Sequence, residues 1–160
     1  MRVLLFGGSH GGFTTGPKTL IDYLRQRSRP YLFSNTLPPA VVMGSLAAID
    51  LLEKDTSFIT RLRENTAYFR AQLTARGVKV REGIHPIVPI LIGDTAKAIA
   101  MSGELLDRGV YVSGFGFPVV PQGAARLRCQ ISAAHTREHL DMAIEAIVGL
   151  AEKYGVIASA

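Results

Sequence analysis

Two arginines, Arg126 and Arg128, stand one residue apart in the chain. In an extended strand alternate side chains project to the same face, so both guanidinium groups would lie opposite Leu127 and Cys129. A guanidinium group held on a strand can bind a carboxylate through two parallel hydrogen bonds. The spacing therefore predicts a carboxylate clamp, and the alternative is a pair of solvated surface arginines.

Three short polar residues, Ser34, Asn35 and Thr36, lie just before Pro38-Pro39. Proline is favoured in the first turn of a helix, so we expect a helix to begin here. Hydroxyl, amide and backbone N–H groups beside a helix start can bind an anion such as phosphate. The simpler interpretation is that these residues only cap the helix.

A glycine-rich run at residues 7–12 contains the G-x-S-x-G pattern of the hydrolase elbow around Ser9, and Asp94 and His135 follow in matching chain order. That elbow normally follows several strands of a parallel sheet, and almost nothing precedes it here. A close crossing of two backbones is the simpler interpretation of the glycines. His135 is a candidate proton carrier, although a histidine at a helix start usually has a structural role.

Composition excludes several classes of function. The chain has 160 residues, of which 48% are hydrophobic and 19% charged, as in an ordinary globular protein. The single cysteine, Cys129, excludes an intrachain disulfide and a cysteine-based zinc site, and it fits a reducing, cytoplasmic setting. His10 and His85 show no convergent ligand spacing, so we expect no metal site. The net charge of +5 is spread out and lacks the aromatic interleaving of a nucleic-acid platform, and no apolar run approaches the roughly 20 residues that span a bilayer.

Hydrophobic periodicity, proline positions and glycine positions predict five helices, at about 17–27, 38–53, 56–76, 95–108 and 137 onward. Short strands are expected at 3–6, 78–81, 87–92, 110–113 and 126–132. The order from residue 78 onward indicates an α+β unit, with a small, mostly antiparallel sheet and helices packed on one face. We expect the nearly all-apolar strand 87–92 to be central and the strand 3–6 to have no partner in this chain. Pro30 disfavours helical geometry for Arg29, and the bulky residues 31–33 suit an extended, packed segment.

Four segments occur in a recognisable order: GGSHGGFT at 7–14, LRQRSRPYLFSNTLPP at 24–39, GFGFPVVP at 114–121 and ARLRCQISAAH at 125–135. Together they resemble the α-oxoamine synthases, a pyridoxal-phosphate-dependent family of fold-type-I transferases. The likeness is greatest to the branch that joins glycine to the acetyl group of acetyl-CoA. It covers nearly the whole chain but corresponds only to the C-terminal portion of the family. The resemblance implies a remnant of the α/β large cofactor domain at residues 1–36 and the small domain at residues 37–160.

The resemblance also implies roles for individual residues. The family carries its Schiff-base lysine in a G-K-A-L-G-G segment, and aligning the glycines places Leu4 at the lysine position. Ser34 and Asn35 match the pair that reaches the partner subunit's cofactor phosphate in the family dimer. Arg128 matches the arginine that binds the carboxylate of the amino acid. No catalytic residue is therefore assigned, and we expect no covalent bond to pyridoxal phosphate.

By resemblance, the intact enzyme condenses glycine with acetyl-CoA to 2-amino-3-ketobutyrate and free CoA, in threonine degradation. We expect this chain alone to be inactive, and the replaced lysine segment after Met1 suggests a truncated reading frame or gene fragment. An alternative is a non-catalytic small-domain module that self-associates through exposed apolar helix faces, as a homodimer or larger assembly. A hydrolase that uses Ser9 is the remaining alternative. Partners from the nucleic-acid and membrane classes are not expected.

Overall fold

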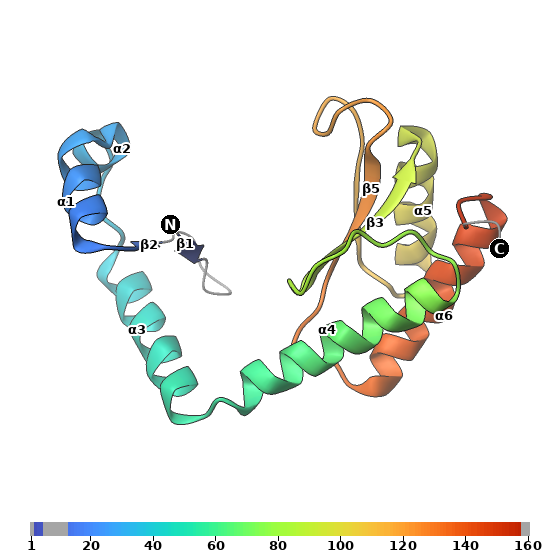
Figure 1. The fold of residues 1–160 in the computed structure, drawn as a ribbon, viewed down its shortest axis with the longest axis horizontal. Coiled ribbons are helices and arrows are strands. Elements are labelled where there is room, and N and C mark those ends of the chain that lie inside the picture. Colours follow the sequence, from blue (N-terminus) through green and yellow to red (C-terminus); the bar gives the residue numbers. More distant parts are fainter. Residues whose placement is uncertain (1, 5–12, 158–160) are drawn as a thin grey trace. The chain divides into compact units, whose positions relative to one another are not determined.

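The computed structural model describes residues 2–4 and 13–157, and the chain divides into two compact units, 1–56 and 57–160 (Figure 1). The first unit contains two short strands followed by three helices: β1 (Arg2–Leu4), β2 (Phe13–Thr15), α1 (Lys18–Arg27), α2 (Arg29–Phe33) and α3 (Pro39–Lys54). Strands β1 and β2 pair antiparallel, with Leu4 opposite Phe13. The expectation that the first strand has no partner in this chain was therefore wrong.

Helix α2 corrects a second expectation, because residues 31–33 are helical rather than extended. Pro30 occupies the first turn of this helix, where its missing N–H breaks no hydrogen bond and its fixed φ angle suits the helix. The backbone N–H of Ser34 donates to the carbonyl oxygen of Pro30 at 2.9 Å and closes the last turn. Pro30 thus starts a short helix instead of preventing one.

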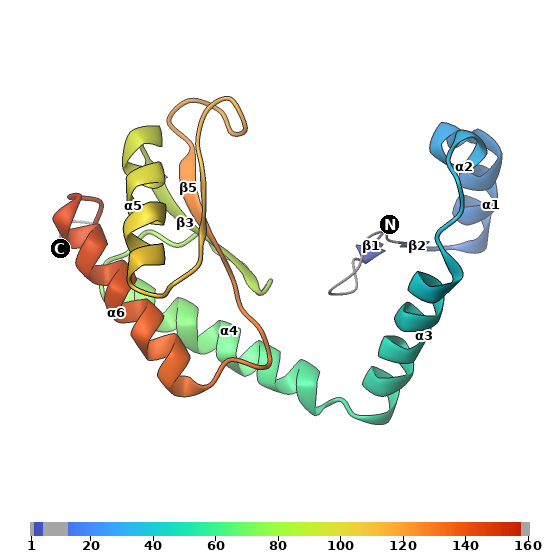
Figure 2. The ribbon, with the colours of Figure 1, turned by 180° about the vertical axis from the view of Figure 1, so that it is seen from behind.

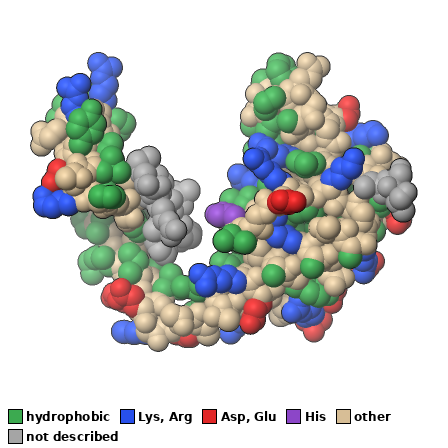
Figure 3. Space-filling model, viewed as in Figure 1, with side chains coloured by type: hydrophobic (Ala, Val, Ile, Leu, Met, Phe, Trp, Pro, Cys, Tyr) green, Lys and Arg blue, Asp and Glu red, His purple; other side chains and the backbone are tan. Residues whose placement is uncertain are grey.

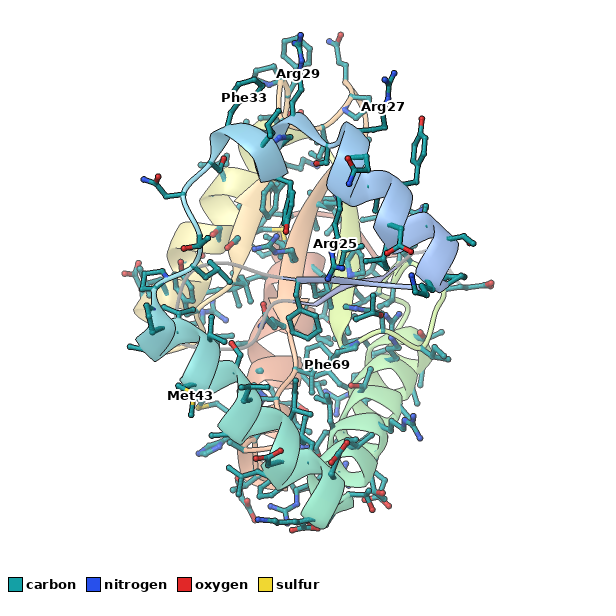
Figure 4. All side chains as sticks on the ribbon, turned by 90° about the vertical axis from the view of Figure 1, so that its left-hand side faces the viewer. Arg25, Arg27, Arg29, Phe33, Met43 and Phe69 are labelled. Atoms are coloured by element: carbon teal, nitrogen blue, oxygen red, sulfur yellow. The ribbon has the colours of Figure 1, made fainter. Side chains whose placement is uncertain are left out.

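The helices of the first unit bury none of their residues. Helix α3 begins at Pro39, within one residue of the prediction, yet no residue of its expected core face is fully buried. Figure 3 shows apolar side chains, in green, at the surface of this unit, and Figure 4 labels Phe33 at the end of α2 and Met43 on α3. The prediction that α3 buries one face was wrong within the described part of this unit, where the face is at most half-buried. The residues concerned are Val41, Val42, Ala48, Ile49 and Leu52.

The second unit is an α+β fold, as expected from the sequence. Its elements are α4 (Ser57–Ala75), β3 (Ile87–Gly93), α5 (Thr95–Asp107), β4 (Ser113–Phe115), β5 (Ala125–Gln130) and α6 (Arg137–Lys153). The three strands form an antiparallel sheet in the order β3–β5–β4, so β5 is central and β3 lies at an edge. The expectation of a central strand at 87–92 was wrong. Burial alternates along β3, as on a strand with one covered face. The expected strand 78–81 appears as isolated bridges, from Val78 to Ile157 and from Val80 to Ile90. Two backbone hydrogen bonds, from Arg81 to Pro89 and from Leu91 to Lys79, join this segment to β3.

Helix α5 packs against all three strands, and α6 packs against α4 and α5 (Figures 1 and 2). Gly114 on β4 allows close contact with α5, because a Cβ atom there would lie 2.8 Å from the carbonyl oxygen of Ala98. The core lies between these helices and one face of the sheet. Its most deeply buried members include Phe69, Leu73, Val88, Ile90, Met101, Leu105, Leu127, Ile144, Ile147 and Leu150.

The helix ends of the second unit follow the sequence prediction. The side chain of Asp94 accepts the backbone N–H of Lys97 at 2.8 Å and caps α5. Thr136 caps α6 in the same way. Gly77 and Gly109 follow α4 and α5 with positive φ angles of 76° and 78°, which glycine adopts without steric cost. Within residues 2–4 and 13–157, no helix is both long enough and apolar enough to cross a membrane.

Candidate functional site

The central strand β5 presents Arg126 and Arg128 as its sequence predicts. Leu127 and Cys129 are buried, whereas Arg126 is half-buried and Arg128 is exposed. Arg128 lies opposite Ser113 of β4, and β3 flanks the other side of β5. Hydrogen bonds to both neighbouring strands therefore hold the backbone from which the guanidinium group projects.

The guanidinium group of Arg128 stacks on an aromatic ring. Its Cζ atom lies 4.9 Å from the ring centroid of Phe115 on β4, which is a cation–π geometry. Among the described residues, none forms a hydrogen bond or an ion pair with this guanidinium group. The group is thus oriented by Phe115 while its N–H donors stay available for an anion. The sequence did not reveal this stacking, because it depends on which strands are neighbours.

Arg128 also lines a cavity of about 750 Å³ in the second unit. No aspartate or glutamate is found among the described residues that line it, so its electrostatics favour an anionic ligand. Apolar side chains from α4, α6 and the segment before β4 form much of the wall, including Phe69, Val112, Leu140 and Ile147. The polar side chains in the wall are Ser113, Arg128, Gln130, Ser132, His135 and His139, together with Tyr111.

Two histidines in the cavity wall are held as hydrogen-bond acceptors. The Nδ1 atom of His135 accepts the backbone N–H of Ser132 at 3.2 Å. The Nδ1 atom of His139 accepts the backbone N–H of Thr136 at 3.3 Å, which completes a capping box at the start of α6. Burial, and secondarily the nearby His139, lower the pKa of His135 below its ordinary value. Both contributions favour neutral imidazole at neutral pH.

A buried amide fixes the turn that carries His135. The Nδ2 atom of Asn65 on α4 donates to the carbonyl oxygen of Ser132 at 3.1 Å and to that of His135 at 2.9 Å. The turn between β5 and α6 is therefore tied to α4. His139 was not singled out from the sequence, although its four-residue spacing from His135 in a predicted helix start was a usable signal.

Cys129 is not a nucleophile in this arrangement. Burial raises the pKa of its thiol to about 12, because the low-polarity surroundings disfavour the thiolate. The side chain therefore packs as a small apolar group beneath the strand that carries Arg128.

The model of one large family, aminotransferase class I and II, matches residues 6–147. This chain belongs to that family. Among its relatives, the mouse mitochondrial 2-amino-3-ketobutyrate coenzyme A ligase is 46% identical over 151 residues, which cover 94% of this chain and 36% of the relative. The Escherichia coli K12 enzyme of the same name is 44% identical over 152 residues, which cover 95% of this chain and 38% of that enzyme.

Solved structures agree with this assignment. A structure of SPT with a PLP internal aldimine superposes with a TM-score of 0.79 at 30% identity, covering 91% of this chain and 37% of that chain. The resemblance to pyridoxal-phosphate enzymes that the sequence predicted is thereby confirmed. This family member spans little more than a third of the length of these relatives.

The predicted phosphate-binding residues of this aminotransferase-family chain lie in the first unit, between α2 and α3. Ser34, Asn35 and Thr36 are exposed. Their hydroxyl and amide groups suit phosphate oxygens, but the backbone N–H of Ser34 is already bonded to Pro30. The chemistry of these donors fits the cofactor's phosphate, and their role stays a prediction.

The placement of Leu4 at the position of the family's lysine stays a prediction. Leu4 lies in β1, and leucine has no amine with which to bond an aldehyde. The hydrolase prediction rests on Ser9, which lies outside the described residues together with His10, and the carboxylate of Asp94 is used to cap α5. Among the described residues, no group of three histidine, cysteine, aspartate or glutamate side chains is placed to hold a metal ion.

Proposed function

We propose that this chain is the C-terminal part of a pyridoxal-phosphate-dependent acyltransferase that condenses glycine with acetyl-CoA to 2-amino-3-ketobutyrate and CoA. The observation that carries the proposal is the guanidinium group of Arg128, oriented by Phe115 on the central strand and lining a cavity with no acidic residue among its described walls. The identity of 44–46% to 2-amino-3-ketobutyrate coenzyme A ligases supports the acetyl branch of the family. The whole reaction would belong to threonine degradation.

Arg128 would bind the carboxylate of glycine through two parallel hydrogen bonds and so orient its α-carbon. Ser34 and Asn35 would bind the phosphate of the cofactor, in a homodimer, through their hydroxyl and amide groups. Bound pyridoxal phosphate supplies an electron-withdrawing ring that stabilises negative charge at the α-carbon. We propose residues 1–36 as the remnant of the large cofactor domain and residues 37–160 as the small domain.

Leu4 leads to a further proposal, that the chain alone does not catalyse this reaction. Its side chain cannot form the bond that the family's lysine makes with the cofactor aldehyde. Lys18 is no substitute, because it lies on α1 and forms an ion pair with Asp22. Any pyridoxal phosphate bound by this chain is held without a covalent bond.

The test combines absorbance with mass spectrometry on the purified 160-residue protein. With pyridoxal phosphate added, we expect no visible band of a lysine-bound cofactor and no lysine labelled after borohydride reduction. A labelled lysine would contradict the proposal of an inactive chain. In parallel, glycine titrations should show weak binding that Arg128→Gln abolishes, whereas Arg81→Gln, which changes an arginine outside the cavity, should leave it unchanged.

A second candidate function is a self-associating module without catalysis. The observation that favours it is the exposure of large apolar side chains in the first unit, among them Tyr31, Leu32 and Phe33, which are 67–78% exposed. Apolar surface of this kind is normally covered by another protein surface. Light scattering should then give the mass of a dimer or larger assembly, and a clean monomer would contradict this alternative. For location we propose the cytoplasm, although the mouse relative is named mitochondrial.

A further inference from the structure

The cavity wall contains three side chains whose outward donors are unused. The guanidinium group of Arg128 forms no hydrogen bond or ion pair with the described residues. His135 and His139 use one ring nitrogen each, and their ring centroids lie 6.5 Å apart in an edge-to-face arrangement. All three belong to the same cavity of about 750 Å³, which suggests that one ligand contacts more than the arginine.

The hydrogen bonds of the two histidines determine where their protons lie. Because Nδ1 accepts a backbone N–H in both rings, the neutral imidazole must carry its proton on Nε2. Each ring therefore offers one Nε2–H donor, and no acceptor among the described residues contacts either of these atoms. The burial that favours neutral His135 also means that this donor adds no charge to the cavity.

We propose that His135 and His139 form a second subsite, which binds an uncharged oxygen atom of a carboxylic acid whose carboxylate is held by Arg128. This inference rests on the proposed function, since Arg128 is the carboxylate partner in both. The charged guanidinium group suits the carboxylate. Neutral N–H donors suit a keto or hydroxyl oxygen, which needs no compensating charge. The ligand class is thus a short carboxylic acid that carries a second oxygen along its chain.

Two probes of equal charge and chain length isolate the histidine subsite. Butyrate and 3-hydroxybutyrate differ only in the hydroxyl group, and both can be titrated into the full 160-residue protein at pH 7.5 by NMR. We expect 3-hydroxybutyrate to bind roughly two- to tenfold more tightly, which corresponds to one net neutral hydrogen bond. Long-range proton–nitrogen spectra should show both histidines protonated on Nε2. These Nε2 signals should shift with 3-hydroxybutyrate and stay in place with butyrate.

The variants keep the turn and remove the donors. In His135→Asn the side-chain oxygen can still accept the N–H of Ser132, and in His139→Gln the side chain can still complete the capping box. Each variant should reduce the preference for 3-hydroxybutyrate towards onefold and leave butyrate affinity unchanged. His85→Asn is the matched control, because the Nδ1 atom of His85 also accepts a backbone N–H, from Ile87 at 3.1 Å, but this residue is not in the cavity wall.

The outcomes separate the two proposals. If Arg128→Gln weakens butyrate binding at least tenfold but the wild-type protein does not distinguish the two acids, the histidine subsite is wrong and the carboxylate site stands. If Arg128→Gln leaves binding of both acids unchanged, or if neither acid binds, the role of Arg128 is wrong and the histidine subsite is overturned with it. A preference that survives both histidine variants would also overturn the subsite.

Discussion

Leu32 and Leu127 show how differently the two compact units treat the same side chain. Leu32, on α2 of the first unit, is 73% exposed, whereas Leu127, on β5 of the second unit, is fully buried. The contrast extends to whole elements: α1, α2 and α3 bury no residue, whereas α6 alone buries seven. Helices thus form in both units, but among the described residues only those of the second unit bury side chains.

This difference separates local from tertiary stabilisation. Helices α1 and α3 of the first unit begin at or directly after a proline and end within a few residues of where their sequences predict. Short helices are marginal in water unless an apolar face is covered, so the first unit needs another surface to be stable. The second unit closes its own core and should fold without help.

The largest expected effect is that of a core truncation in the second unit. Leu127→Ala should lower the free energy of unfolding by about 2–5 kcal/mol, since it removes buried methyl groups and leaves a cavity at the central strand. Leu32→Ala, the matched change in the first unit, should change it by less than about 0.5 kcal/mol. Urea denaturation followed by circular dichroism measures both. Similar losses for the two variants would show that the first unit is covered in solution.

A smaller effect is expected for the buried amide. Asn65→Ala should lower the free energy of unfolding by about 1–3 kcal/mol, because the carbonyl oxygens of Ser132 and His135 lose their shared donor. Asn35→Ala, on the exposed segment between α2 and α3, provides the control and should be nearly neutral. The measurement is again urea denaturation at pH 7. A neutral Asn65→Ala would mean that water satisfies these carbonyl groups and that the turn is not tied to α4.

The next effect depends on pH and concerns the second unit alone. The folded state lowers the pKa of His135 below its ordinary value, so the unfolded chain takes up the proton first as the pH falls. The contribution of neutral His135 to the free energy of unfolding is complete above the ordinary histidine pKa of about 6.5. It is lost as the pH falls through the lower pKa that His135 has in the folded state. Between pH 7 and 5, wild-type protein should therefore lose more stability than His135→Asn. If the free energy of unfolding changes equally with pH in the two proteins, this linkage is contradicted.

The smallest effect is expected when the first unit is removed. In a chain of residues 57–160, the free energy of unfolding of the second unit should stay within about 0.5 kcal/mol of its value in the whole chain, because its core contains no residue of the first unit. Urea denaturation measures this value. The same deletion should abolish self-association if the exposed helices cause it. A large loss of stability on deletion would show that the two units share a core.

The functional residues were predictable to different degrees. Arg128 was identified from its alternation with Leu127, which depends only on nearby residues, and from the family resemblance, which depends on the order of motifs along the chain. Its partner Phe115 and the contribution of His139 were not, because the strand register and the closing of the turn against Asn65 bring them into place. The roles of Ser34, Asn35 and Arg128 towards cofactor and substrate stay predictions.

The sequence by itself determined where helices begin and end, as at Pro39, Asp94, Gly77 and Gly109, because caps and breakers act within about four residues of chain. It also determined the alternation along β5 and the family. Only the tertiary structure decided that β5 rather than β3 is central in the three-stranded sheet and that α1–α3 bury none of their residues. It also decided that Arg128, His135 and His139 share one cavity. These features depend on contacts between residues far apart in the chain, which local patterns do not encode.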